Sequence, residues 1–585
     1  MKQRFTKRTR LVSALLTLAM VFTFLPFSAF AEEELTDGYG IIELAEYILP
    51  DKAFREYLKK FDTNNDGKLA PAERYAVKEI DVREKNISDL YGIQFFPNLR
   101  KLACYGNQLT SLDVSQNTKL ETLWCNQNNL TSLDVSQNPA LKYLSCDKNN
   151  LTSLDVRQNA ELRSLDCAEN NLTSLDVRQN AKLRWLYGGK NQLTSLDVSQ
   201  NPALENLHCH ENKLTSLDVS QNPALQILLC NGNKLTSLDV SQNPVLWTLL
   251  CNGNQLTSLD VSKNTILSEL DCYQNHLTSL DVSKNPDLGY LRCNDNALTS
   301  LDVSQNLELR ELDCNFNRLT SLDVSKNTKL TGLWCVRNEL MELDVSQNPE
   351  LKDLFCGTTG LKKLDVSKNQ KLEHLGCDYN QLTELDLSQN PELTYLICEK
   401  NLLTSLQADN CTKLTDLNCS KNEYPVEVYW QTRILDPSIL PGNFDISRVK
   451  NLNGATKNAD GTLTVQGGGG KVTYEYRCVG STYKTFTLNV TETDNPNAGT
   501  EPPVTPPSGG DGTGTVTPPS GGGTGTTTPP SGGGGTGTTT PPSGGGTGTT
   551  TPPSGGDGTG TTTPPSGGDG TGTVTVSYTH LTLPT

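Results

Sequence analysis

Residues 120–140 read LETLWCNQNNLTSLDVSQNPA, and close copies of this 21-residue unit fill the middle of the chain. The string LDVS, or a near relative of it, places a leucine every 21 residues from Leu112 to Leu406. A unit of this length cannot bury its apolar side alone, so each copy must stack against its neighbours. The periodicity therefore predicts a solenoid of about fifteen coils.

Each unit matches the pattern L-x-x-L-x-L-x-x-N-x-L, with Cys125 in the third apolar place, and so resembles a leucine-rich repeat. The two halves of the unit are also alike, because LETLWCNQN is followed ten residues later by LTSLDVSQN. In this the sequence is similar to the nested subclass of bacterial leucine-rich repeats, which implies a β-rich coil with two near-extended sides. The resemblance covers residues 99–422, and its departures at Gly188, Thr359 and Gln407 are expected to weaken single coils only.

Fifteen of the seventeen cysteines share one phase of the repeat and should form a column of buried thiols. Neighbours in the column lie one strand spacing apart with parallel Cβ vectors, whereas a disulfide needs Cβ atoms about 3.8 Å apart and turned toward each other. A zinc site would need clustered CxxC and His ligands, which the sequence lacks. We therefore expect free thiols that pack as small apolar groups. Cys411 and Cys478 fall outside this phase, and no role follows for them.

Asparagine and aspartate also recur with the 21-residue step. The asparagine column, from Asn107 to Asn422, lies where the chain leaves the first strand, and its amides can satisfy turn backbone groups of adjacent coils. The aspartate column, from Asp113 to Asp386, lies on the far strand, where stacked like charges should repel. The favoured interpretation is a solvated face with Ser and Thr hydrogen bonds, and the alternative is a divalent-cation ladder.

The residues that flank the inward leucine of the first strand vary from copy to copy, whereas the LDVS side stays nearly constant. Strand alternation turns these variable positions outward. Large aromatic side chains are unusual on an exposed sheet unless they meet a partner. The candidate ligand-binding face comprises Trp124, Tyr143, Trp185, Tyr187, Tyr290, Trp334, Phe355 and Tyr395. Such a surface suits an extracellular protein or a glycan, and the alternative is that outward positions drift wherever packing permits.

The sequence does not predict an enzyme, because it has only five His residues and no nucleophile–base motif. The segment His208-Cys209-His210 is the best local candidate for chemistry, but alternation turns Cys209 inward and both His residues outward. Two outward His side chains could hold a metal ion weakly. Ordinary surface histidines are the favoured interpretation.

A calcium loop precedes the repeats, because residues 62–73 read DTNNDGKLAPAE and fit D-x-[DN]-x-[DN]-G-x5-E without a gap. This resembles an EF-hand loop. The resemblance implies that the side chains of Asp62, Asn64 and Asp66, the carbonyl of Lys68 and the bidentate carboxylate of Glu73 hold calcium. Ala70 has no oxygen, so water would take its place. The alternative is a vestigial loop that no longer binds, and no second loop of the kind a dockerin needs is found in the sequence.

Residues 1–31 have the layout of a signal peptide, with a basic start, an apolar run and small residues at Ala29 and Ala31. Pro26 interrupts the apolar run and no second run of membrane-spanning length follows, which argues against a retained anchor. Loss of the five basic residues of this segment, which holds no acidic residue, takes the net charge from −16 to −21. A nucleic-acid partner is therefore not expected. We expect a secreted or cell-surface protein, associated with the cell wall and monomeric.

The remaining segments surround the solenoid. Residues 32–98 are expected to hold the EF-hand-like cap and an irregular first repeat, because terminal repeats are atypical. Strand-like segments predict a small β domain over residues 423–494. Residues 495–575 repeat TPPSGGGTGTT with almost no apolar residue, which predicts a disordered linker suited to crossing a cell wall. The last ten residues, 576–585, resemble a translated sequencing adapter, so LPT is not taken as part of a sortase signal.

This order of segments resembles the internalin-like leucine-rich-repeat proteins of Gram-positive cell surfaces. The resemblance implies a non-catalytic recognition protein or adhesin that binds a protein or a glycan through the aromatic strand face, with structural calcium in the cap. The alternative is a calcium-stabilised structural spacer of the cell surface. An adhesin requires the aromatic face for binding, whereas a spacer tolerates its loss.

Overall fold

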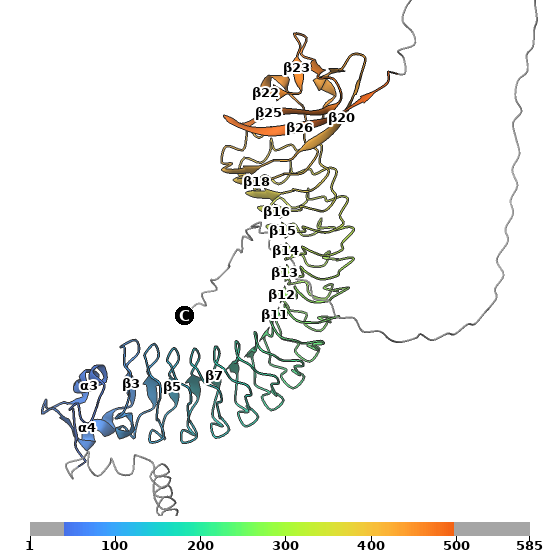
Figure 1. Cartoon of the computed structure of the whole chain (residues 1–585). Helices are drawn as coiled ribbons and strands as arrows, with labels where there is room; N and C mark the ends of the chain where they lie inside the picture. The colour runs from blue at the N-terminus through green and yellow to red at the C-terminus, as the bar shows by residue number, and fades with distance from the viewer. Residues whose placement is uncertain (1–39, 496–585) are drawn as a thin grey trace, which may run out of the picture. The chain divides into compact units, whose positions relative to one another are not determined.

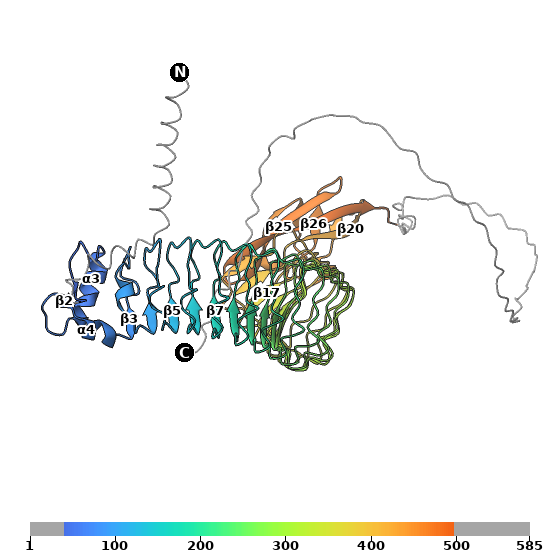
Figure 2. The same cartoon turned by 90° about the horizontal axis from the view of Figure 1, so that it is seen from below.

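The computed structural model describes residues 40–495, and its centre is one parallel sheet of seventeen three-residue strands, β3 to β19 (Figure 1). Each strand pairs with the strand of the next coil, and the arrows lie side by side in Figure 2. The strands are β3 (Glu79–Asp81), β4 (Lys101–Ala103), β5 (Thr122–Trp124), β6 (Tyr143–Ser145), β7 (Ser164–Asp166), β8 (Trp185–Tyr187), β9 (Asn206–His208), β10 (Ile227–Leu229), β11 (Thr248–Leu250), β12 (Glu269–Asp271), β13 (Tyr290–Arg292), β14 (Glu311–Asp313), β15 (Gly332–Trp334), β16 (Asp353–Phe355), β17 (His374–Gly376), β18 (Tyr395–Ile397) and β19 (Asp416–Asn418). The predicted solenoid is confirmed. Its strands outnumber the LDVS strings because no such string follows β3 or β19.

The coils stack in strict register, so every position of the repeat forms a straight column along the sheet. Leu228 pairs with Leu207 on one side and with Leu249 on the other, and the same pairing holds along the sheet. Pairing of equal positions follows from the constant 21-residue step. A column of identical side chains is therefore a direct consequence of the repeat length.

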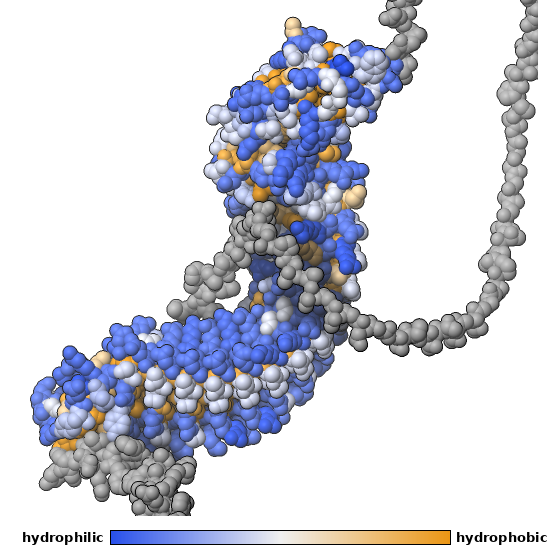
Figure 3. All heavy atoms as spheres, in the orientation of Figure 1, coloured by the Kyte–Doolittle hydropathy of each residue, from blue (hydrophilic) through white to orange (hydrophobic). Residues whose placement is uncertain are grey.

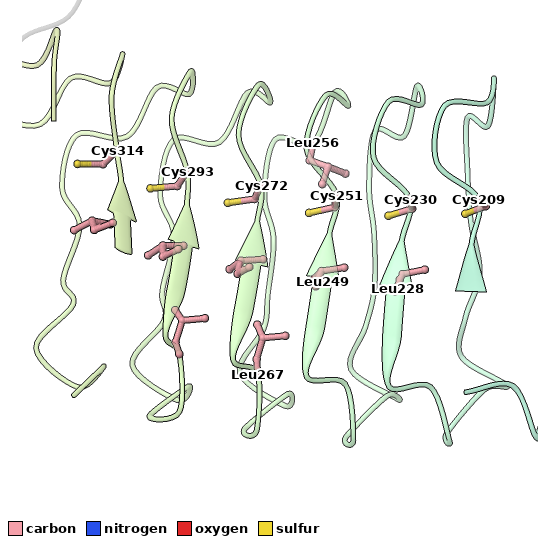
Figure 4. Packing of buried hydrophobic residues seen from close by; sticks show 14 of the residues in the cluster. Cys209, Leu228, Cys230, Leu249, Cys251, Leu256, Leu267, Cys272, Cys293 and Cys314 are labelled. Carbon is pink, nitrogen blue, oxygen red and sulfur yellow. The ribbon is translucent and has the colours of Figure 1, made fainter. Parts of the chain in front are cut away.

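The core consists of leucine, valine and cysteine columns. The cysteines from Cys209 to Cys314 contribute one thiol per coil in a single row in Figure 4, beside the leucine column of Leu228 and Leu249. All seventeen cysteines are buried and unpaired, as predicted for the fifteen that share one phase. Burial raises the pKa of Cys125 and Cys251 to about 12, so these thiols stay protonated at neutral pH.

The first asparagine column joins adjacent coils, as the sequence predicted. The amide of Asn128 donates to the carbonyls of Cys104 at 3.0 Å and Cys125 at 3.1 Å, and its Oδ1 accepts from the N–H of Leu109 at 3.0 Å. This arrangement holds a turn in which Gln127 adopts a positive φ of 52°. The same turn position is Gly106 in the first coil, with φ of 66°, where glycine adopts the conformation without a side-chain penalty.

A second asparagine column, which was not predicted, consists of the last residue of each SQN string. Asn138 is fully buried and donates to the carbonyls of Val114 and Asn117, both at 3.0 Å. Cys411 takes this position in the last coil, and its thiol lies 3.7 Å from the carbonyl of Leu387. Cys411 therefore belongs to the second asparagine column and not to the cysteine column.

The far side of the coil, formed by the LDVS strings, is held by short local hydrogen bonds. Asp113 accepts from the N–H of Ser115 at 2.9 Å, and adjacent coils are linked here by isolated bridges such as Asp113 to Asp134 and by the second asparagine column. The N–H and hydroxyl of Ser241 lower the pKa of Asp239 in the same way. The Ser hydrogen bonds of the favoured interpretation are therefore present. Within residues 40–495, no group of three or more His, Cys, Asp and Glu side chains is placed to hold a metal ion, so the structure gives a cation ladder no support.

Residues 42–96, which include the first strand β3, form the N-terminal cap of the solenoid. The cap contains β1 (Ile42–Glu43), α3 (Lys52–Leu58), the 3-10 turn η1 (Lys59–Phe61), β2 (Lys68–Leu69), α4 (Pro71–Ala76) and the 3-10 turn η2 (Ile93–Phe95). Phe54, Leu58 and Phe96 are buried in it and continue the core of the solenoid. Asp51 caps α3 by accepting from the N–H of Phe54 at 3.0 Å.

Residues 423–493 form the C-terminal β domain. One sheet has the order β20 (Glu423–Tyr429), β26 (Thr482–Thr493), β25 (Gly470–Val479) and β22 (Val449–Asn453). A second contains β21 (Ile434–Leu435), β24 (Leu463–Val465) and β23 (Ala455–Lys457), with 3-10 turns η3 (Pro437–Ile439) and η4 (Ile446–Arg448) between the strands. The hydroxyl of buried Tyr474 donates to the carbonyl of Thr404 at 2.7 Å. The domain is thereby fixed to the last coils.

No helix within the described residues is long and apolar enough to cross a membrane. The expected signal peptide, nearly all of the expected linker and the adapter-like end lie outside residues 40–495.

Candidate binding face and calcium loop

All eight aromatic candidates lie on the outward side of the parallel sheet, a surface that we call the strand face. Each three-residue strand contributes its first and third side chains to this face, while its central side chain, a leucine in every strand but β3, packs against the core. Tyr143 and Tyr290 are 37% and 39% exposed, and the other six are half-buried. Figure 3 shows the consequence of the register, since hydrophilic and hydrophobic residues form bands along the stacked coils. Whether this surface binds a ligand stays a prediction.

One aromatic patch surrounds β8 and β9. The rings of Tyr187 and His208 meet edge to face with centroids 4.6 Å apart, and His210 follows at 6.3 Å from His208. Arg184 lies over the ring of Trp185, 4.8 Å from its centroid. A Cβ atom on Gly189 would clash with the imidazole of His210, so this glycine makes the close packing of the ring feasible.

His208 and His210 are not ordinary surface histidines, which corrects the sequence interpretation. Both are half-buried, and the buried atoms His208 Nε2 and His210 Nδ1 have no hydrogen-bond partner among the described residues. Burial lowers the pKa of His208 to about 4, so its ring is neutral at physiological pH. Tight packing of neighbouring coils against Tyr187, which the sequence does not reveal, causes the difference.

A second aromatic patch covers β15 to β18. The ring centroids of Phe355 and Tyr395 are 6.3 Å apart, and His374 lies 6.2 Å from Tyr395. Small residues accommodate the large rings here. Trp334 lies across Gly332, and a Cβ atom on Gly376 would approach Cδ1 of Phe355 to 2.5 Å.

Charged side chains occupy the strand face between the two aromatic patches. Arg292 lies 3.2 Å from the carboxylate of Asp271 and 3.3 Å from that of Glu311. Burial raises the pKa of Asp271 and Asp313 to about 6, and that of Asp166 near the first patch to about 7. Strand alternation predicts that these carboxylates point outward, but their burial depends on contacts between coils that the sequence does not show.

Apolar side chains that were not predicted lie just before the strands. Trp247 precedes β11 and is 40% exposed, and Ile266 in the next coil is 43% exposed. Ile227 of β10 and Leu250 of β11, on the strand face, are half-buried. Comparing the residue just before each strand, in addition to the strand itself, would have found Trp247.

A cavity of about 630 Å³ lies on the opposite side, between the far side of the last coils and a loop of the C-terminal domain. Its polar lining includes Asp365, Glu384, Asp386, Gln407 and Asn443. The loop is held by Gln407 Nε2, which donates to the carbonyl of Asn443 at 2.8 Å. This cavity is not predictable from the sequence, because the loop that closes it is far from the repeats along the chain.

The loop 62–73 is closed by hydrogen bonds from its own backbone to its acidic side chains. Asp62 accepts from the N–H of Gly67 at 2.8 Å, and Gly67 has a φ of 80° at the point where the chain reverses. Glu73 closes the loop by accepting from the N–H groups of Thr63 at 2.7 Å and Ala70 at 2.9 Å. These bonds, and above all that from the Thr63 hydroxyl, lower the pKa of Glu73.

The loop is also supported from outside. After Gly67, β2 pairs antiparallel with β1, and Leu69 faces Ile42 across the pair. Asp66 accepts from the N–H of Lys68 at 2.9 Å, and Asn64 donates to Asp66 at 2.9 Å. The acidic side chains thus cap backbone groups, consistent with the finding that no three of the acidic, His or Cys side chains described converge on one point. The donor set of carboxylates, an amide and a carbonyl nevertheless fits calcium.

The comparisons with known proteins agree with this geometry. The family model of leucine-rich repeats (2 copies) matches residues 97–138. The functional domain of InlJ from Listeria monocytogenes, described as including a cysteine ladder, is 31% identical with a TM-score of 0.63. That match covers 77% of this chain and 99% of the InlJ domain.

A leucine-rich-repeat protein of Leptospira interrogans is 27% identical with a TM-score of 0.52, and the match covers 57% of this chain and 93% of that one. No curated protein sequence matches the chain. The identity, the coverage and the shared cysteine column together show the family. The chain belongs to the internalin-like leucine-rich-repeat proteins.

Proposed function

We propose that this chain is a non-catalytic recognition protein, secreted or held at the cell surface, that binds an extracellular protein through the strand face. One observation carries the proposal. Outward positions of the strand vary between coils and gather aromatic groups into two patches, whereas the far side repeats LDVS almost unchanged. Leucine-rich-repeat proteins of this kind typically bind proteins, which supports a protein ligand over a glycan.

The chemistry of the two patches suits a protein interface. Tyr and Trp side chains bring large apolar area and a polar group at low conformational cost, and such residues dominate the energy of protein interfaces. The buried nitrogens His208 Nε2 and His210 Nδ1 have no hydrogen-bond partner among the described residues, so a rotation of these rings on binding would let them pair with a ligand. The charged cluster around Arg292 between the patches would contribute orientation.

The test compares two matched variants of the full chain on arrays of extracellular proteins and, separately, of glycans. The first replaces Trp185, Tyr187, Trp334 and Phe355 by alanine. The control replaces four exposed far-side glutamines by alanine, namely Gln116, Gln137, Gln305 and Gln347. We expect a saturable protein ligand that the aromatic variant loses by at least about 100-fold, since two hot-spot truncations already cost that much. The control should bind unchanged.

The other outcomes would overturn the proposal in different ways. A protein ligand that the aromatic variant still binds would remove the strand face from the account. A glycan ligand lost in the aromatic variant would replace the ligand class. Silence on both arrays would favour a structural spacer.

We further propose that the loop 62–73 holds a structural calcium ion, with Asp62, Asn64, Asp66, the Lys68 carbonyl and Glu73 as ligands. The antiparallel pairing of β2 with β1 supports this proposal, because the pairing holds the loop in place. A second loop would otherwise be needed for that support. Calcium at 100 times its dissociation constant would stabilise the cap by about 2.7 kcal/mol.

Melting in calcium and in chelator tests this second proposal. We expect the unmutated chain to melt at a higher temperature with calcium, and the double variant Asp62→Ala, Glu73→Gln to show no such shift. Glu46→Gln, which removes a carboxylate from the same cap but outside the loop, should keep the calcium-dependent rise in melting temperature. The absence of a calcium-dependent shift in the unmutated chain would end the proposal.

A further inference from the structure

Cys478 of the C-terminal domain extends the cysteine column beyond the last coil. Its thiol and that of Cys419 form a side-chain hydrogen bond, and Cys419 makes a second one with Cys398. All three residues are fully buried. The residue that stands apart in the sequence thus becomes the next member of the column in space.

The backbone around Cys478 is anchored to the last coils. Its carbonyl accepts from the N–H of Ala408 at 2.9 Å. The amine of Lys484, on the neighbouring strand β26, donates to the carbonyl of Leu417 at 2.7 Å. The contact between the two thiols therefore lies inside a fixed junction between the solenoid and the β domain.

The junction differs from the rest of the column in the strand that carries its last thiol. From Cys104 to Cys419, each cysteine of the column follows a strand of the parallel sheet, whose register keeps neighbouring thiols about one strand spacing apart. Cys478 lies on β25, which pairs only with β22 and β26, so its Cα–Cβ vector is not bound to that register. It can turn toward Cys419 as a disulfide requires.

Cys419 is also the thiol most easily activated. Hydrogen bonds from the thiols of Cys398 and Cys478, assisted by the charge of Lys484, lower the pKa of Cys419. The same bonds and burial raise the pKa of the other two thiols. Since the thiolate is the nucleophile in thiol–disulfide exchange, Cys419 is the expected attacking group.

We propose that Cys419 and Cys478 form a disulfide that joins the last coil covalently to the C-terminal β domain. The oxidant is a disulfide, either a small molecule or a protein. The reaction takes place as the junction forms, before packing excludes the oxidant: the Cys419 thiolate attacks one sulfur of that oxidant and releases a thiolate, giving a mixed disulfide. Cys478 then loses its proton and attacks the Cys419 sulfur, which releases the second thiolate. Two cysteine thiols lose two electrons in total, one external disulfide gains them, and the protons pass to the released thiolates.

Cys398 is the competing partner, because a single Cys419 sulfur can join only one of its neighbours. Leu396 and Leu417 hold β18 and β19 in parallel register, which keeps Cys398 and Cys419 side by side at strand spacing. That spacing exceeds the Cβ separation of about 3.8 Å that a disulfide needs. Cys398 should therefore remain a free thiol.

Peptide mapping of the full chain tests the proposal directly. The chain is refolded with oxidised glutathione, unfolded, alkylated without reductant and cut with trypsin. We expect two of the seventeen cysteines to escape alkylation. The tryptic peptide 414–421 should be linked to the peptide 478–484, because cleavage after Lys413, Lys421, Arg477 and Lys484 isolates each cysteine. Alkylation of all seventeen cysteines would overturn the proposal, as would a link from 414–421 to the peptide 372–400.

Variants add a readout that does not depend on peptides. Reductant should lower the melting temperature of the oxidised unmutated chain, and Cys478→Ala should melt at one temperature with or without reductant. Cys377→Ala, which removes a member of the column outside the junction, should keep the reductant effect. If Cys478→Ala does not fold, the mapping on the unmutated chain still decides. A reductant effect that persists in a folded Cys478→Ala would contradict the assignment.

Discussion

The strand face and the far side of the solenoid come from the same 21-residue unit, yet they differ in the bonds that hold them and in how much their residues vary. The far side is held by local bonds that need particular residues, such as the one between Asp239 and Ser241. The strand face is held by backbone pairing and by inward leucines, so its outward side chains are unconstrained by the fold. Sequence variation between coils therefore concentrates on the strand face, where packing restricts the side chains least and where the aromatic residues lie.

The largest effect on stability is expected from substitution of a buried asparagine of the second column. Asn243→Ala would remove bonds at 3.0 and 2.9 Å to the carbonyls of Val219 and Asn222, each of which keeps one backbone N–H donor. Since each lost hydrogen bond costs about 0.5–1.5 kcal/mol, we expect a loss of roughly 1–3 kcal/mol in the free energy of unfolding. Urea unfolding of the full chain measures it. The neighbouring exposed change Gln242→Ala should cost less than about 0.5 kcal/mol, and equal costs for the two would refute the account of the column.

An intermediate effect is expected at Asp166 on the strand face. Burial, aided by Asp147, raises its pKa to about 7, well above an unfolded value of about 4. A raised folded pKa makes the folded state hold the proton, so this carboxyl contributes a destabilisation that grows as pH rises from about 4 to 7. Asp166→Asn should therefore stabilise the chain on the order of 1–2 kcal/mol at pH 8, and the gain should vanish near pH 4. Thermal melting across this pH range measures it, and a gain that does not change with pH would contradict the cause.

The smallest effect, of opposite sign, is expected at Asp239 on the far side. Its pKa is lowered by the N–H and hydroxyl of Ser241. A lowered folded pKa contributes stability that is present above the unfolded pKa and is lost as pH falls through the folded pKa. Asp239→Asn should therefore cost a little stability at pH 7 and nothing in strong acid. The same pH series checks this, and a stabilising effect at pH 7 would show that the two faces do not differ electrostatically as described.

The fold was largely predictable because a strict period determines register, and register determines which residues meet. The buried cysteine column and the first asparagine column followed from spacing alone. The second asparagine column was equally visible, and Cys411 in its phase was the signal that was overlooked. The place of Cys478 beside the column was not predictable, because its contact with Cys419 depends on how β25 packs against the last coil.

Parts of the candidate site were beyond sequence reasoning for a similar reason. The outward position of Tyr187 and His208 followed from alternation, but their mutual packing and the burial of His208 depend on neighbouring coils and on Gly189. The far-side cavity needs the loop at Asn443, which is distant in sequence. Local pattern gives the direction of a side chain, whereas burial and pKa depend on contacts between coils.

Hydroxyl-radical footprinting of the full chain, with and without the protein ligand found on the array, tests the central claim most directly. The account predicts that the ligand slows oxidation of Trp185, Tyr187, Trp334 and Phe355 on the strand face. Tyr47 of the cap, 73% exposed, and Trp430 of the C-terminal domain, 49% exposed, should react unchanged. Protection at Tyr47 or Trp430 with none on the strand face would place the ligand elsewhere and contradict the account.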